Sequence, residues 1–117
     1  MPKSIHFLKT DKSTSQNLAS AALSYSADWG KKVKVEGVYF KASVGITETI
    51  TITLDSALGA NYDIVLRKRT LSSEQNFVFI PEGELNLQSG DKLLIACTNA
   101  NVTGVVYVNI KASEMGV

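Results

Sequence analysis

The sequence predicts an all-β fold, an antiparallel two-sheet β-sandwich with a jelly-roll-like arrangement of about eight strands. Short segments in which apolar and polar residues alternate recur along the 117 residues, and turn residues separate them. Their spacing is typical of a β-sandwich or barrel. No long amphipathic helix is present that would cover a parallel sheet, so the strands should pair in antiparallel fashion. An immunoglobulin-like sandwich would need paired cysteines and a mid-domain tryptophan, whereas a closed up-and-down barrel remains an alternative.

Length and composition indicate one globular domain and exclude several functional classes. Apolar residues make up 44% and charged residues 20% of the chain, which is too apolar for a disordered protein. The net charge of +1 gives no overall field that would attract nucleic acid or a membrane, so neither is an expected partner. No apolar run approaches the roughly 18 residues of a membrane span. Because Cys97 is the only cysteine and no apolar signal segment opens the chain, we expect synthesis in a reducing cytoplasm.

The first 30 residues are the least regular part of the sequence, and we expect them to form an arm or the first strands. Residues 4–10 fit a first strand, and residues 9–17 are polar and rich in serine and threonine, which indicates a loop. Residues 16–27 combine helical spacing with strand-like alternation, and the serines among them favour a strand. Asp28, Trp29 and Gly30 then form a turn.

The middle of the chain contains the clearest strand patterns. Residues 32–42 alternate but change phase across Glu36 and Gly37, which is typical of a β-bulge. Residues 43–45 should turn the chain. In residues 46–54, isoleucine and leucine at positions 50, 52 and 54 point to one face and four threonines to the other. This pattern predicts a strand with one face on a core.

Three further strands are expected at residues 62–67, 77–80 and 102–112. In the first of them, Tyr62, Ile64 and Leu66 should point inward and Arg67 outward. The second ends at Pro81, which cannot donate a ladder hydrogen bond. The expected organisation is an arm or first strands at residues 1–30, a single sandwich core at 31–113 and a frayed tail at 114–117.

Residues 84–96 contain a sharp reversal at Gly90. As a two-residue hairpin, it would place the bulkier apolar residues of the second segment on the polar face of the first. A crossing from one sheet to the other lets the apolar residues of both segments face one core. These residues are Leu85, Leu87, Leu93 and Ile95. We therefore predict a sheet-crossing corner, with Leu94 and Ala96 at a subunit contact.

No group of residues in the sequence has the spacing of a catalytic, cofactor or metal site. His6 is the only histidine, and its near-terminal place without a nucleophile-elbow pattern argues against a catalytic role. One histidine and one distant cysteine cannot hold zinc. Loop carboxylates and amides are too scattered to predict a calcium site, since their places in turns explain them. We expect no enzyme activity, no cofactor and no metal.

Basic and aromatic residues provide the candidate binding surfaces. Clustered charges at residues 31–34 and 67–69 are typical of solvated strand faces, and the second cluster also suits contact with an acidic protein. Three strands, at 38–40, 77–80 and 105–108, are apolar on both faces. A two-layer sandwich buries one face of each sheet, so self-association is the simplest source of a second buried surface. The candidate interface residues are Trp29, Tyr39, Arg67, Arg69, Leu94 and Tyr107.

Residues 32–110 resemble small structural proteins encoded among bacteriophage head and tail genes. The shared features are an alternating strand that ends in Leu54-Asp55-Ser56, a Gly-Ala-x-Tyr-Asp joint at residues 59–63, and a Pro-Glu-Gly lead at residues 81–83. This lead enters a Leu-x-Leu-x-x-Gly-Asp motif at residues 85–91, which a final strand follows. The last motif is also similar to trimeric jelly rolls of the tumour-necrosis-factor and complement type.

The resemblance implies a non-enzymatic virion component, best matched by a capsid decoration or cement protein. Such proteins are small β-sandwiches, often homotrimers, that bind the major capsid protein and bridge neighbouring capsomers. Residues 1–30, including His6 and Trp29, would supply an arm that clamps the shell or a neighbouring subunit, and the protein would assemble into virions in the host cytoplasm. Alternatives are a tail or neck adaptor, or a carbohydrate-binding module with Trp29, Tyr39 and Tyr107 as its aromatic platform.

Overall fold

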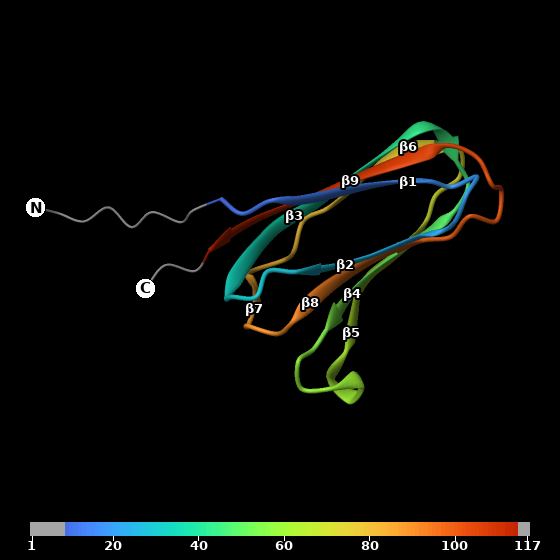
Figure 1. Ribbon diagram of the computed structural model, residues 1–117. Helices are drawn as coiled ribbons and strands as arrows, with labels where there is room; N and C mark the ends of the chain where they lie inside the picture. Colours follow the sequence, from blue (N-terminus) through green and yellow to red (C-terminus); the bar gives the residue numbers. More distant parts are fainter. Residues whose placement is uncertain (1–8, 115–117) are drawn as a thin grey trace, which may run out of the picture.

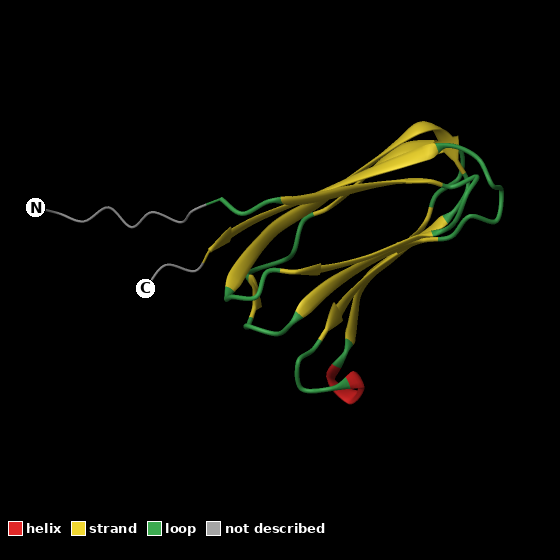
Figure 2. Cartoon of the chain, viewed as in Figure 1, coloured by secondary structure: helices red, strands yellow, loops and turns green. Residues whose placement is uncertain are grey.

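The computed structural model describes residues 9–114, which form two antiparallel sheets packed face to face (Figures 1 and 2). The first sheet, sheet A, contains β1 (Lys12–Asn17), β9 (Val105–Glu114), β3 (Val33–Ile46), β6 (Glu74–Phe79) and β7 (Leu85–Leu87). The second, sheet B, contains β2 (Leu23–Asp28), β8 (Lys92–Cys97), β4 (Thr49–Asp55) and β5 (Ile64–Thr70). A short 3-10 helix, η1 (Ala60–Tyr62), lies between β4 and β5.

The strand order confirms the predicted jelly-roll sandwich. Sheet A has the order β1-β9-β3-β6, and sheet B has the order β2-β8-β4-β5. Early strands therefore pair with late ones, and the chain crosses between the sheets at every connection except β4–β5 and β6–β7. The described residues form nine strands instead of about eight. The strand that the sequence did not predict is β1, in residues expected to form a loop. Pro81 separates β6 from β7, and both of these short strands pair with β3.

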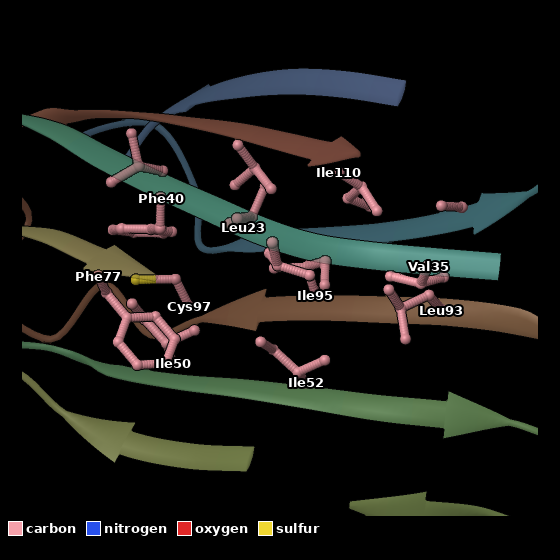
Figure 3. Close-up of a cluster of buried hydrophobic side chains, with 14 of the residues drawn as sticks. Leu23, Val35, Phe40, Ile50, Ile52, Phe77, Leu93, Ile95, Cys97 and Ile110 are labelled. Carbon is pink, nitrogen blue, oxygen red and sulfur yellow. The ribbon is translucent and has the colours of Figure 1, made fainter. Parts of the chain in front are cut away.

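The core lies between the sheets, and period-2 alternation decides which side chains enter it (Figure 3). On β4, Ile50 and Ile52 are buried while the threonines between them face outward, as predicted. On β9 the buried residues are Val106, Val108, Ile110, Ala112 and Ser113. The core therefore consists mainly of aliphatic side chains from both sheets, together with Phe40, Phe77 and Cys97.

Two predicted irregularities are confirmed. The register between β3 and β9 shifts between Val35 and Gly37, which is the predicted bulge. The chain leaves sheet A after β7 and enters sheet B at β8, so Gly90 is at a sheet-crossing corner, and its φ of 96° suits glycine. Asp91 fixes this corner, because its carboxylate accepts hydrogen bonds from the amides of Gln88 and Ala57.

Several boundaries predicted from the sequence are wrong. Residues 12–17 form β1 and pair with β9 over their whole length, although their polar composition indicated a loop. Residues 43–45 continue β3, and Ser113 and Glu114 belong to β9. A register shift in the β4–β5 pair places Arg67 opposite Ile52, on the inward row and not the outward one.

The N-terminal region contributes one strand to each sheet. The preference for strand over helix in residues 16–27 is confirmed from Leu23 onward, where β2 pairs with β8. Asp28 accepts a hydrogen bond from the amide of Gly30, which forms the predicted turn. His6 and the rest of residues 1–8 lie outside the described residues, as does the tail at 115–117.

Gly45 is required for close packing, not for a turn. A Cβ added there would lie 2.9 Å from the backbone oxygen of Ser73. Because backbone atoms cannot turn aside as a flexible side chain can, we expect Gly45→Ala to lower the free energy of unfolding by about 1–3 kcal/mol. Val44→Ala, at the exposed neighbour, is the matched control. Urea denaturation of both variants tests this, and an unchanged Gly45→Ala midpoint would contradict it.

Candidate interaction surfaces

Most of the exposed large apolar side chains on the described part of the chain fall into two groups, and Val44 and Val102 lie outside both. The first group, which we call the tyrosine face, lies on the outer side of sheet A. It consists of Tyr39, Val78 and Tyr107, with Ser13, Ser15, Lys41, Asn76 and Asn109 around them. The second group, the open flank, lies where β5 faces β6 and β7. It consists of Leu58, Tyr62, Ile64, Val65, Leu66, Arg67, Phe79, Ile80 and Leu85.

Strand register brings the members of the tyrosine face together. Tyr39 lies opposite Val78 on β6 and opposite Asn109 on β9, and Tyr107 lies opposite Lys41. Outward residues at such positions are neighbours on one face of a sheet. Tyr39 is 37% exposed and Tyr107 is 51% exposed, and they border a shallow hollow of about 580 Å³. This surface is therefore amphipathic and concave.

The tyrosine face contains one polar atom without a partner. Asn109 Oδ1 is buried and accepts no hydrogen bond from any residue that the structure describes. An unpaired buried acceptor costs about 1–3 kcal/mol. The Lys111 ammonium lies 5.7 Å from the centre of the Tyr39 ring, which places a cation at the edge of the same area.

The open flank arises because the β4–β5 hairpin projects beyond the rest of the sandwich (Figure 1). Ile64 pairs with Leu54 on the inward row of sheet B, yet it is exposed, as are Val65 and Tyr62. The expectation that Tyr62 and Ile64 point into the core is therefore wrong. Leu58, in the loop before η1, is 75% exposed. These side chains have no layer packed above them.

A hollow of about 490 Å³ lies next to the hairpin on the same flank. Leu66 and Leu85 contribute apolar side chains to it, and both also pack against the core. Arg67 lines one side, and Glu82 and Glu84 line another. The hollow thus presents mostly polar surface, with a few apolar side chains and charges of both signs among its lining residues.

The two arginines of the predicted interface cover the edge of the core. The guanidinium groups of Arg67 and Arg69 lie 6.0 and 5.9 Å from the centre of the Phe77 ring, across the gap between the sheets. Arg69 also pairs with Glu74 at 3.1 Å. Arg67 and Lys68 form no ion pair with any residue in the range 9–114. Their charges remain available to a partner.

The remaining predicted interface residues lie elsewhere. Trp29 is only 8% exposed, and its Nε1 donates a hydrogen bond to the Thr10 carbonyl at 2.7 Å, so it cannot serve as an exposed platform. Leu94 is half-buried on the outer face of sheet B, opposite Ser26 and Thr53. A subunit contact at Leu94 stays a prediction. The structure therefore groups Tyr39 with Tyr107 and Arg67 with Arg69, and separates Trp29 and Leu94 from both pairs.

Sequence reasoning missed the apolar tip of the hairpin. The signal was available at Ile64, Val65 and Leu66, which are three consecutive apolar residues in one strand. The same both-face pattern identified the other strands with an exposed apolar face. Leu58 was missed because it lies in a short loop between alanine and glycine, where no periodicity exists.

One buried carboxylate organises the loop between β8 and β9. Glu48 is 3% exposed and accepts hydrogen bonds from the Thr98 hydroxyl at 2.7 Å and from the amides of Ala100 and Asn101 at 2.9 and 2.8 Å. Burial raises the pKa of Glu48, but these hydrogen bonds outweigh burial, and the pKa lies below its ordinary value. Burial, followed by the charge of Glu48, raises the pKa of Cys97 to about 11. The arrangement is a structural anchor with an inert thiol.

The described residues contain no group of three or more acidic, histidine or cysteine side chains that would hold a metal ion. Within residues 9–114, no helix has the length and apolar character needed to cross a membrane. Comparison with protein-family models and with curated proteins found no match to this sequence.

Proposed function

We propose that this chain is a non-enzymatic bacteriophage virion protein of the decoration or cement type, which associates with itself and binds the head shell. One observation carries the proposal. Apolar side chains are exposed in two groups, the tyrosine face and the open flank, on a sandwich whose core is already closed. Exposed groups of this kind are typical of protein contacts. A protein that joins copies of itself to a shell needs two such surfaces, and the phage resemblance of residues 32–110 supports the same role.

The mechanism is stabilisation by binding. Each contact that exists only in the assembled shell shifts the equilibrium toward that shell by mass action. Association of several copies would increase the effective concentration of the remaining binding surfaces once one copy is bound. We assign shell binding to the tyrosine face, because its hollow combines the exposed ring of Tyr107 with the charged Lys41.

Sedimentation with phage heads tests this function. Heads assembled without the protein should bind it saturably, in numbers comparable to their capsomers, and should then resist heat to a higher temperature. Tyr107→Ser should weaken binding, whereas Val44→Ser, an exposed substitution outside both groups, should not. Binding of a few copies at one vertex would indicate a tail or neck adaptor instead. Absence of any binding to heads or tails would contradict the virion role.

A carbohydrate-binding module is the second candidate. The observation that favours it is the combination of Tyr39 and Tyr107 with amide and hydroxyl side chains on one concave face. Aromatic rings pack against sugar rings, and amides and hydroxyls bond their hydroxyl groups. Calorimetric titration with a panel of neutral oligosaccharides, for the wild type and for Tyr107→Ser, distinguishes this function from shell binding.

A further inference from the structure

Strand register arranges the tyrosine face in two rows that cross sheet A. The first row runs from β1 to β6 through Ser15, Tyr107, Lys41 and Asn76. The second row runs in the same direction through Ser13, Asn109, Tyr39 and Val78. Neighbours within a row lie about 5 Å apart, and the two rows lie about 7 Å apart. The face is therefore a small, ordered patch whose side chains one partner would cover together.

Lys41 occupies the centre of this patch. Tyr107 is its neighbour in the same row, Tyr39 precedes it on the same side of β3, and Val78 lies diagonally across from it on β6. These three neighbours are the apolar side chains of the tyrosine face, and they are between 37% and 51% exposed. Among the described residues that line the hollow, Lys41 is the only charged one. The charge of the hollow is thus surrounded by its apolar surface.

The ammonium group of Lys41 forms no ion pair with any residue in the range 9–114. Two carboxylates on the same sheet already have cationic partners. Glu36, on the same strand, is paired with Lys9. Asp11, just before β1, is paired with Lys111. The described part of the chain therefore leaves the central charge of the tyrosine face to be neutralised by solvent or by a partner.

The position of Lys41 restricts the chemistry of any partner that covers the face. A surface that packs on the two tyrosines and Val78 also removes water from the ammonium group between them. Desolvation of a charge costs free energy unless an opposite charge replaces the water. A purely apolar or a basic partner surface would therefore bind poorly. A carboxylate set among apolar side chains satisfies both parts of the face, and its hydrogen bond to an ammonium group is stronger than that of an uncharged acceptor.

We propose that the shell surface bound by the tyrosine face presents a carboxylate to Lys41, flanked by apolar side chains that pack on Tyr39, Val78 and Tyr107. The inference rests on the proposed function, since it states the chemistry of the partner that this function requires. The apolar contacts supply most of the affinity, and the ion pair fixes the orientation of the chain on the shell. Because the face is concave, the acidic segment that it receives is convex.

Binding of three variants to heads assembled without the protein tests the contact. Lys41→Gln removes the charge and should weaken binding at least about 10-fold. Lys41→Arg keeps the charge and should bind within about threefold of the wild type. Lys32→Gln, the matched control, changes the net charge equally at an exposed residue before β3 that forms no ion pair within residues 9–114, and it should bind as the wild type does. Urea denaturation should show that all three variants fold.

Chemical modification of the heads tests for the carboxylate itself. Treatment with a carbodiimide and glycinamide converts exposed carboxylates on the heads into amides, and electron microscopy should show that the modified heads are intact. The wild type should bind modified heads at least about 10-fold more weakly than untreated heads. Lys41→Gln should bind the two kinds of head within about twofold of each other, because its side chain has no charge to pair.

Three results would overturn the proposed contact. Equal binding of the wild type and Lys41→Gln to untreated heads would mean that the ammonium group reaches solvent past Asn76 on the edge strand β6, and it would leave the proposed function intact. Absence of any binding to heads would refute the function and the contact together. Binding of an oligogalacturonate that Lys41→Gln abolishes, without any change in head binding, would assign the lysine to an acidic sugar instead.

Discussion

Glu48→Ala should lower the free energy of unfolding by about 3 kcal/mol and the melting temperature by about 10 °C or more. The substitution leaves the Thr98 hydroxyl and the amides of Ala100 and Asn101 without their acceptor. These bonds are partly buried, so donors that lose a charged acceptor there are incompletely solvated, which costs free energy beyond the lost hydrogen bonds. Chemical denaturation and calorimetry measure both quantities.

The Glu48 carboxylate should also make the free energy of unfolding depend on pH in the acidic range. Because its pKa in the folded protein lies below the ordinary value of 4.5, its contribution is fully present above pH 4.5 and is lost as the pH falls through the folded value. The difference in stability between the wild type and Glu48→Gln should therefore shrink from pH 7 toward pH 3. Glu36, whose pKa is lowered chiefly by a hydrogen bond from Lys9, is present in both proteins and cancels.

Glu82→Gln provides the matched control for these measurements, since Glu82 is exposed and forms no ion pair with any described residue. Its stability should equal that of the wild type within about 0.5 kcal/mol at neutral pH. If Glu48→Gln were as stable as Glu82→Gln at pH 7, the anchoring role of Glu48 would be refuted.

The sequence predicted those parts of the fold in which side-chain burial follows residue type. β4 and β9 alternate apolar and polar residues and were recognised, because each has one face on the core. β1 was not recognised, because an edge strand made of lysine, serine, threonine and glutamine is held by backbone bonds to β9 and not by its own apolar side chains. Amino-acid composition therefore does not predict this kind of backbone pairing.

The residues singled out by the structure likewise include some that the sequence pattern predicted and one that it did not. Tyr39 and Tyr107 were predicted, because apolar residues on both faces of a strand imply an exposed apolar face, and the register then makes them diagonal neighbours on that face. Glu48 was overlooked, although it occupies the same phase as Ile46 and Ile50 and so should point inward. Its partners follow it by 50 or more residues, and only the fold brings them to it.

Trp29→Ala should destabilise the protein by about 3–5 kcal/mol without changing its oligomeric mass. The ring is buried in the turn between β2 and β3, and its Nε1 bonds the Thr10 carbonyl just before β1. The Lys12 ammonium lies 5.8 Å from the ring centre, on β1 itself. Trp29 therefore joins the start of sheet A to the end of a sheet B strand, and its loss opens a cavity at that joint.

Two further variants separate this structural role from the interface role predicted for Trp29 on sequence grounds. Trp29→Phe keeps most of the apolar ring and loses the hydrogen bond, so it should cost about 1 kcal/mol beyond the loss of ring volume. Tyr107→Ala, at a half-exposed aromatic residue, should change stability by no more than about 0.5 kcal/mol. Urea denaturation and sedimentation of the three proteins decide between the roles, because an interface residue would alter the mass and leave the stability of the single chain intact.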